Sequence, residues 1–160
     1  MINLDKTKAQ KKVKLVELAP NIYDSYLKKA QNCLRSAKLL HKEVLYENAV
    51  TQSYYAMYDA ALALLFLCGI KSEDHNISIA LLHFLFENKE LALIIEKAKK
   101  ERIDKQYYIT NEENEPLTKE ISIKLIKEAE QVIAEIRVQK QQLSGESIRK
   151  IRSNLQKFMS

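Results

Sequence analysis

The sequence predicts an all-α protein, an up-and-down bundle of four to five main helices followed by a C-terminal amphipathic helix. Only 2 glycines and 2 prolines occur among 160 residues, whereas a sandwich or barrel of many short strands needs turn residues at every corner. A content of 46% hydrophobic and 29% charged residues is that of a globular chain, neither disordered nor fibrous. Apolar side chains also recur at helical spacing along most of the chain.

The first helix is expected over residues 22–42, where Asn21 is placed to cap its N-terminus just after Pro20. Its apolar positions follow helical spacing, and they include Tyr23, Leu27, Ala30, Leu34 and Ala37. A second helix follows over residues 46–68 after a connection so short that the two helices should form an antiparallel hairpin. Gly69 is placed to end the second helix.

The second helix carries the most informative pattern. A stripe of mostly small side chains lets another helix approach closely, and it contains Ala49, Ser53, Ala56, Ala60 and Ala63. Tyrosines and leucines on a neighbouring face supply most of the area to be buried. From residue 60 onward the helix is apolar nearly all round. We therefore expect it to be buried on every side, by the bundle or by a second subunit.

Three further helices complete the expected bundle. The third begins at a cap on Ser72 and ends near residue 88, and the fourth covers residues 89–109. After an acidic loop, a fifth helix begins at a cap on Thr118 and extends toward residue 142. A last amphipathic helix is expected over 147–158. The chain then divides into a basic N-terminal arm (1–20), a helical bundle (21–143) and the C-terminal amphipathic helix (144–160).

Positive charge gathers at the two ends of the chain. Residues 1–18 carry a net charge of +3 and residues 137–160 carry +5, whereas residues 19–136 carry −3. Basic segments of this kind bind phosphate backbones, and they also keep helical proteins in solution. Both interpretations remain open at the level of sequence.

The sequence favours a cytoplasmic protein without membrane association or cofactor. Its longest apolar stretch, 60–70, is shorter than the roughly 20 residues that span a bilayer. Cys33 and Cys68 lie in apolar helical contexts and are expected to be reduced thiols. The three histidines show no metal-ligand spacing, and two glycines do not build a phosphate-binding loop, so we expect neither a metal nor a cofactor.

One polar cluster has the residue types of a phosphate site. In the fourth helix Arg102 is followed by Tyr107 and Tyr108. A guanidinium holds phosphate through two hydrogen bonds, and a phenol ring stacks on a base or donates a hydrogen bond. The alternating charges around Arg102 are equally typical of a solvated helix face.

Several segments, in this order, resemble HEPN-domain proteins over residues 22–143. The second helix carries Tyr46-x-x-Ala49, then Ser53-Tyr54-Tyr55-Ala56-Met57-Tyr58, then the apolar run from Ala60 to Leu65. The family continues with a glycine, a short loop and a histidine, which correspond to Gly69 and His75. Arg102 and Tyr107 correspond to its arginine and tyrosine before an acidic loop, and Glu128-Ala129-Glu130 to the motif of its final long helix.

The resemblance implies a small all-α bundle that forms a homodimer. It also implies an RNA or nucleotide ligand, and a minimal nucleotidyltransferase as the partner in a toxin–antitoxin-like pair. Active members are metal-independent ribonucleases with an Arg-x(4–6)-His motif, in which the histidine moves a proton and the arginine stabilises phosphate charge. This sequence departs from that motif, because Tyr107 stands where the histidine is expected. A tyrosine with a pKa of about 10 is a poor base at neutral pH, which leaves ribonuclease activity open.

The resemblance assigns catalytic roles to Arg102 and Tyr107, and ligand-binding roles to Ser53, Tyr54, Tyr58 and His75. The alternative is a non-catalytic helical interaction or dimerisation module, in which Arg102 lies on a solvated face. Convergence of Tyr54, Tyr58, His75 and Arg102 in the fold favours the ligand-binding hypothesis, and their dispersal favours the module. A third hypothesis is direct nucleic-acid binding by the two basic ends.

Overall fold

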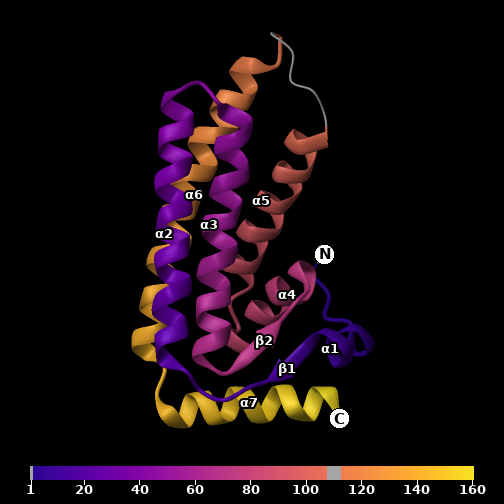
Figure 1. Ribbon diagram of the computed structural model, residues 1–160. Helices are drawn as coiled ribbons and strands as arrows, with labels where there is room; N and C mark the ends of the chain where they lie inside the picture. Colours follow the sequence, from indigo (N-terminus) through magenta and orange to yellow (C-terminus); the bar gives the residue numbers. More distant parts are fainter. Residues whose placement is uncertain (1, 108–112) are drawn as a thin grey trace.

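The structure, a computed structural model, describes residues 2–107 and 113–160, and the side chains of residues 2–104 and 113–160. It confirms the predicted all-α class, because the regular structure of these residues is helical apart from two three-residue strands (Figure 1). No helix in this part of the chain combines the length and the apolar character needed to cross a membrane. In chain order the elements are α1 (Lys6–Lys12), β1 (Val13–Leu15), α2 (Pro20–Lys42), α3 (Tyr46–Leu67), β2 (Ile70–Ser72), α4 (His75–Phe86), α5 (Lys89–Tyr107), α6 (Glu115–Gln142) and α7 (Gly145–Met159).

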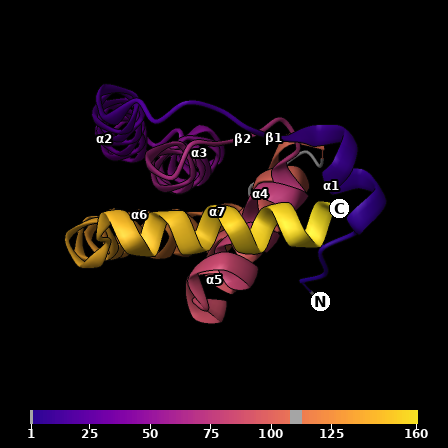
Figure 2. The same cartoon turned by 90° about the horizontal axis from the view of Figure 1, so that it is seen from below.

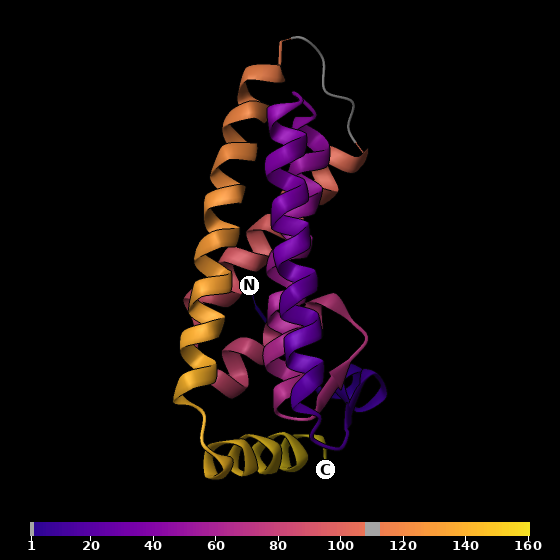
Figure 3. The ribbon, with the colours of Figure 1, turned by 60° about the vertical axis from the view of Figure 1, so that its left-hand side comes forward.

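The centre of the bundle is α3. It packs against α2, α5 and α6, and the long helices α2, α3 and α6 run along the length of the molecule (Figures 1 and 3). Every residue of α3 from Ala56 to Leu65 is buried. The expectation that this helix is enclosed is confirmed, and the other elements of the same chain are sufficient to enclose it.

Small side chains allow α2 and α3 to pack closely. Ala30 and Ala37 of α2 are fully buried, and so are Ala49, Ala56 and Ala60 of α3. Because alanine projects little beyond the backbone, two helices that meet through alanines can approach closely along their length. The predicted antiparallel hairpin is therefore a tightly packed pair, and it holds the tyrosines of α3 in fixed positions.

Three helix starts differ from the sequence-based expectation. α2 begins at Pro20 and not after Asn21, because the fixed φ of proline suits the first turn of a helix. α4 is capped by Asp74, whose side chain accepts from the Ile77 backbone N–H at 3.0 Å, whereas Ser72 belongs to β2. α6 begins at Glu115, so Thr118 lies buried inside the helix and does not cap it.

Both ends of the chain are folded onto the lower end of the bundle. Residues 6–15, which the sequence presents as part of a basic arm, form α1 and β1. β1 pairs with β2 in an antiparallel register that places Val13 opposite Ser72. α7 lies across the same end, with the C-terminus beside α1 (Figure 2). Its buried side chains, Ile151 and Leu155, belong to the main core.

The turn between α3 and β2 is held from below by α7. Gly69 has φ +65° and donates its backbone N–H to the Phe66 carbonyl at 2.9 Å, so it ends α3 as predicted. Arg152 of α7 points its Nη1 at the carbonyl oxygens of Val16, Cys68 and Gly69, at 2.9, 3.0 and 3.0 Å. One guanidinium thus ties α7 to β1 and to the last turn of α3.

Candidate functional site

Three tyrosines of α3 form one wall of the candidate site. Tyr54 and Tyr58 are one turn apart, so their side chains lie on the same helix face. Their rings are nearly parallel, with centroids 6.0 Å apart, and the tilted ring of Tyr55 lies 5.4 Å from Tyr54. Tyr54 and Tyr58 are buried, whereas Tyr55 is partly exposed. The enclosure of α3 by its neighbours therefore fixes an aromatic surface.

His75 closes this wall as the first residue of α4. The cap on Asp74 fixes the first turn of the helix, and with it the direction of the His75 side chain. The imidazole stacks on Tyr58, with ring centroids 4.0 Å apart, and its Nδ1 lies 2.6 Å from the Tyr54 hydroxyl. The histidine that the sequence analysis selected thus contacts both selected tyrosines.

The protonation states of this pair follow from their surroundings. Burial lowers the pKa of His75 below its ordinary value of 6.5, the charges of Arg102 and Lys99 lower it further, and Asp74 opposes the change. Burial raises the pKa of Tyr54 above its ordinary value of 10.0. At this contact the tautomer of the imidazole decides whether the Tyr54 hydroxyl donates to Nδ1 or accepts from it. The lowered pKa of His75 favours an uncharged imidazole at neutral pH.

Arg102 of α5 brings the guanidinium to the same tyrosines. Its Cζ lies 5.0 Å from the ring centroid of Tyr54 and 5.6 Å from that of Tyr55, and its Nη1 donates to the Tyr55 hydroxyl at 3.1 Å. None of the ion pairs among the described residues includes Arg102, and its Nε is buried without a hydrogen-bond partner there. Tyr54, Tyr58, His75 and Arg102 therefore converge.

Two contacts of this cluster were missed at the level of sequence. Tyr55, which the HEPN-like motif contains, was not selected, yet its hydroxyl accepts from Arg102. Lys99 lies one turn before Arg102 and donates to the Asn76 side chain, beside His75. The sequence did contain a signal for Lys99. It lies three residues before Arg102, and residues so spaced share a helix face.

Two predicted residues do not join the cluster. Ser53 is fully buried, and its hydroxyl has no hydrogen-bond partner among the described residues. Tyr107 is the last residue of α5, and its side chain lies outside the described part of the chain. The geometry of the cluster is therefore set by Tyr54, Tyr55, Tyr58, His75 and Arg102.

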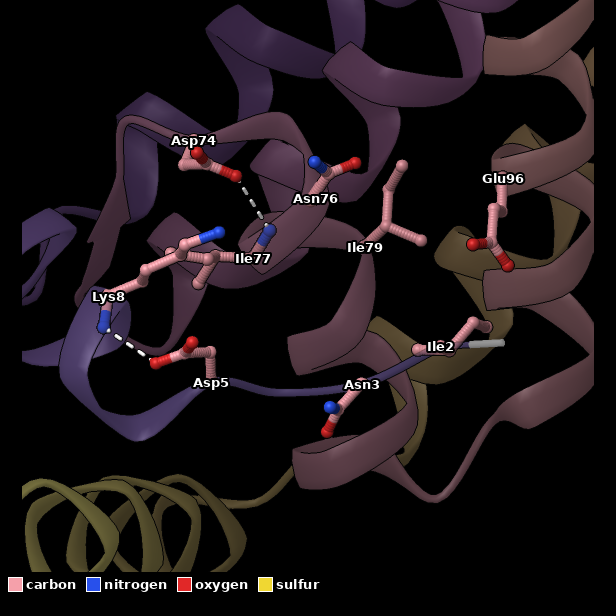
Figure 4. Close-up of a pocket in the computed structure, with 9 residues that line it drawn as sticks. All are labelled: Ile2, Asn3, Asp5, Lys8, Asp74, Asn76, Ile77, Ile79 and Glu96. Carbon is pink, nitrogen blue, oxygen red and sulfur yellow. Dashed lines mark hydrogen bonds between the residues drawn. The ribbon is translucent and has the colours of Figure 1, made fainter.

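A cavity of about 370 Å³ lies beyond the first turn of α4, between the N-terminal segment and α5 (Figure 4). Three carboxylates and one lysine line it, namely Asp5, Asp74, Glu96 and Lys8. Its net negative lining repels a phosphate, and none of the residues selected from the sequence belongs to it. The described residues also contain no group of three or more histidine, cysteine, aspartate or glutamate side chains that could hold a metal ion.

The environment of His75 predicts a loss of stability in mild acid. Because its pKa is lower in the folded protein than in the unfolded chain, the unfolded chain binds the proton first as the pH falls through 6.5. The free energy of unfolding should then decrease, by at most about 1.4 kcal/mol per pH unit, until the folded-state pKa is passed. Urea unfolding between pH 7.5 and pH 5 measures this slope in the wild type and in His75→Gln. Equal slopes in the two proteins would remove His75 as its source.

A family model described as HEPN domain matches residues 23–140 of this chain. No curated protein matches this chain. The matched region begins within α2 and ends within α6, so it contains the whole tyrosine, histidine and arginine cluster.

Proposed function

Because this chain belongs to the HEPN family, we propose that the cluster of Tyr54, Tyr55, His75 and Arg102 binds the phosphate group of an RNA or a nucleotide. The observation that carries the proposal is that the guanidinium of Arg102 has unused hydrogen-bond donors. One of its five N–H donors reaches Tyr55, its Nε is buried without a partner, and no carboxylate among the described residues neutralises it. A phosphate satisfies such donors and supplies the missing negative charge.

The neighbours of Arg102 suit the rest of a nucleotide. Tyr55 is partly exposed, so its ring is available to stack on a base or a ribose. Lys99 adds a second positive charge on the same side of α5, beside Asn76. The neutral His75 adds a hydrogen-bonding nitrogen, Nε2, whose role as donor or acceptor depends on the tautomer. We infer that phosphate recognition uses Arg102 and Lys99, and that the aromatic wall orients the attached nucleoside.

Cleavage of RNA by this site would require a proton acceptor near the phosphate. Tyr107 occupies the motif position of the family histidine, and a phenol is protonated at neutral pH. His75 is neutral there, and it is the imidazole that the fold places beside Arg102. Binding is therefore the function that the site supports best. If a cleavage step occurs, we assign phosphate stabilisation to Arg102 and proton transfer to His75, with Tyr107 as an orienting group.

The proposed partners rest on the resemblance to HEPN proteins. We propose that the protein acts as a homodimer, and as the HEPN component of a pair whose second member is a minimal nucleotidyltransferase. In such a toxin–antitoxin-like pair, an enzyme that handles nucleoside phosphates and a domain that binds them act on related ligands.

The proposal predicts that Arg102→Gln weakens mononucleotide binding by about tenfold or more, since a hydrogen bond to a charged group contributes about 1.5 to 3 kcal/mol. Calorimetric titration with AMP and with uridine 3′-monophosphate measures the affinity. The imidazole signals of His75, followed by NMR in the same titration, report whether the ligand sits at the cluster. Lys100→Gln is the matched control, because Lys100 is exposed on the same helix and its loss changes the net charge equally.

Arg102→Lys separates charge from geometry, because lysine keeps the charge but lacks the planar fork of donors. We expect its affinity to lie between those of the wild type and Arg102→Gln. Both variants are first compared with the wild type in urea unfolding, so that a loss of fold is not read as a loss of binding. Wild-type affinity in Arg102→Gln, or a His75 signal that does not respond to the ligand, would refute the proposal.

One observation favours the interaction module as a second candidate. Val44, in the turn between α2 and α3, has φ +62° although it is β-branched, and its side chain is 55% exposed. Leu39 and Leu45 nearby are also exposed. A positive φ at a β-branched residue is strained, and neighbouring exposed apolar side chains are typical of contact surfaces. If Arg102 proves dispensable for nucleotide binding, this turn becomes the principal candidate surface.

A further inference from the structure

The fold brings the two ends of the chain together into one surface. α1 and α7 meet at the lower end of the bundle (Figure 2). Lys6 Nζ donates to the Ser160 carbonyl at 2.7 Å, and Gln10 Nε2 donates to the Met159 carbonyl at 2.6 Å. β1 continues this surface from α1 toward β2. All of α1, β1 and α7 lie outside residues 23–140, which the family model matches. The surface therefore lies outside the part of the chain that the family model matches.

The net positive charge of the protein resides in these two ends. Residues 1–18 carry five lysines and two acids, and residues 144–160 carry four basic residues and one acid. Together they have a net charge of +6, whereas the whole chain has +5, so residues 19–143 have −1. Two segments from opposite ends of the sequence thus give one end of the molecule a concentrated positive charge.

The cations of this surface are exposed, and among the described residues only Lys14 and Lys12 show an effect on a carboxyl, that of Glu73, whose pKa Lys71 lowers most. We call the surface the basal face and define it by Lys11, Lys12, Lys14, Arg149, Lys150 and Lys157, all of which are exposed. None of the ion pairs within residues 2–104 and 113–160 includes any of them. Arg152, in contrast, is committed to backbone carbonyls and is not part of this surface. The charge of the basal face is therefore available to a partner.

The burial of α1 and α7 identifies the class of that partner. An amphipathic helix that binds a membrane inserts a free apolar face between lipids. Here Ala9 of α1 and Ile151 and Leu155 of α7 are buried in the core, and Phe158 contacts Phe84 of α4. What the two helices present to solvent is polar and mainly cationic, and the aromatic ring of α7, Phe158, is half-buried against Phe84, which is 43% exposed. A surface of this kind suits an extended polyanion that is contacted through its phosphates.

We propose that the basal face binds the phosphodiester backbone of nucleic acid, independently of base sequence. α7 has 15 residues, which corresponds to about 22 Å, and this length lets the face contact several consecutive phosphates. The basal face anchors a polynucleotide by its charge and leaves the bases free. The inference does not rest on the proposed role of Arg102, because no residue of the tyrosine, histidine and arginine cluster belongs to this face.

A pair of charge-matched variants tests the proposal. The basal variant combines Lys11→Gln, Lys12→Gln, Arg149→Gln and Lys157→Gln. The control combines Lys28→Gln, Lys42→Gln, Lys119→Gln and Lys127→Gln, which are exposed lysines of α2 and α6. Both variants lose four positive charges. Fluorescence anisotropy with a labelled oligouridylate of about 20 nucleotides gives the affinity of each protein over a range of salt concentrations.

The wild type should bind more weakly as salt increases, and each phosphate contact contributes about 0.7 to the slope of log affinity against log salt concentration. If the basal variant loses three contacts, its slope decreases by about 2 and its affinity at about 0.1 M salt falls about 100-fold. The control should keep a slope close to that of the wild type. Urea unfolding of each variant shows that it is folded.

Three results would overturn the proposal. The first is no binding of the oligouridylate to the wild type at low salt. The second is an equal loss in the basal and control variants, which would mean that only net charge matters. The third is unchanged oligouridylate binding in the basal variant, together with loss of its binding to vesicles of phosphatidylserine and phosphatidylcholine, which would identify the face as a membrane surface.

Discussion

Replacing Gly69 by alanine is expected to lower the free energy of unfolding by about 2 to 4 kcal/mol, because strain and overlap act together at this position. The backbone has φ +65°, in the left-handed region that residues with a Cβ rarely adopt. A Cβ there would also overlap the Arg152 guanidinium and lie 2.6 Å from the Val16 carbonyl oxygen. The guanidinium could withdraw only by giving up its bonds to three carbonyls.

The chain supplies its own control for this experiment. Gly145 begins α7, and a Cβ there meets no atom nearer than the Arg149 side chain at 3.7 Å. Gly145→Ala should therefore leave stability unchanged or raise it by about 0.5 kcal/mol. Equilibrium unfolding in urea measures both variants. A Gly69→Ala protein as stable as Gly145→Ala would mean that the turn after α3 relaxes without cost.

The effect of Gly69→Ala should extend to the candidate site. Only β2 and two residues separate Gly69 from His75, and Asp74 caps the helix that carries the imidazole. A displaced turn moves β2, and β2 determines where α4 begins. We therefore expect the stacking of His75 on Tyr58 to loosen, which the His75 imidazole signals in NMR spectra would report.

The helices could be predicted from sequence because their signals are local. Helical spacing and the near absence of glycine and proline predicted the helices α2 to α6. The glycine at position 69 predicted the end of α3, where its φ is positive. The first residue of each helix was harder to predict, because neighbouring polar residues compete for the capping position. Ser72 and Asp74 are both good caps, and pairing of Ser72 with Val13 decided in favour of Asp74.

The arrangement of the two termini could not be predicted in this way. The pairing of β1 with β2 joins residues almost sixty positions apart, and a strand of three residues is too short to show a period. The basic residues of α1 predicted an exposed arm. The helix instead packs against the rest of the protein through its one buried residue, Ala9. The bonds of Arg152 to Val16, Cys68 and Gly69 have no sequence signal at all, because they depend on three distant elements meeting.

Tyr54, His75 and Arg102 of the cluster could be chosen from the sequence, but their contacts could not. Tyr54 and Tyr58 share a helix face by their spacing, and Arg102 and His75 came from the resemblance to the family. The hydrogen bond between His75 and Tyr54 depends on how α4 packs against α3. The hydrogen bond from Arg102 to Tyr55 depends on how α5 packs against α3. Ser53 precedes Tyr54 by one residue, so its side chain points about 100° away around the helix and into the core.

Arg152→Met is the second change for which we expect a large effect, a decrease of about 2 to 4 kcal/mol in the free energy of unfolding. Methionine keeps much of the aliphatic stem of arginine but lacks every donor. The carbonyl oxygens of Val16 and Cys68 would each lose the Arg152 contact at a part-buried position, and leaving such groups unsatisfied costs about 1 to 3 kcal/mol each. The carbonyl of Gly69 would keep the backbone bond that it accepts from the Val16 N–H at 2.8 Å.

The matched control is Arg149→Met, which removes the same charge one turn earlier on an exposed face of α7 and should change stability by no more than about 0.5 kcal/mol. Hydrogen exchange adds a local measurement. Because Arg152 joins α7 to β1 and to the end of α3, its loss should increase exchange first in β1 and α7, and much less in the buried middle of α3. Uniform exchange throughout the chain, or equal stability of the two variants, would show that the apolar contacts of Ile151 and Leu155 alone hold the C-terminal helix in place.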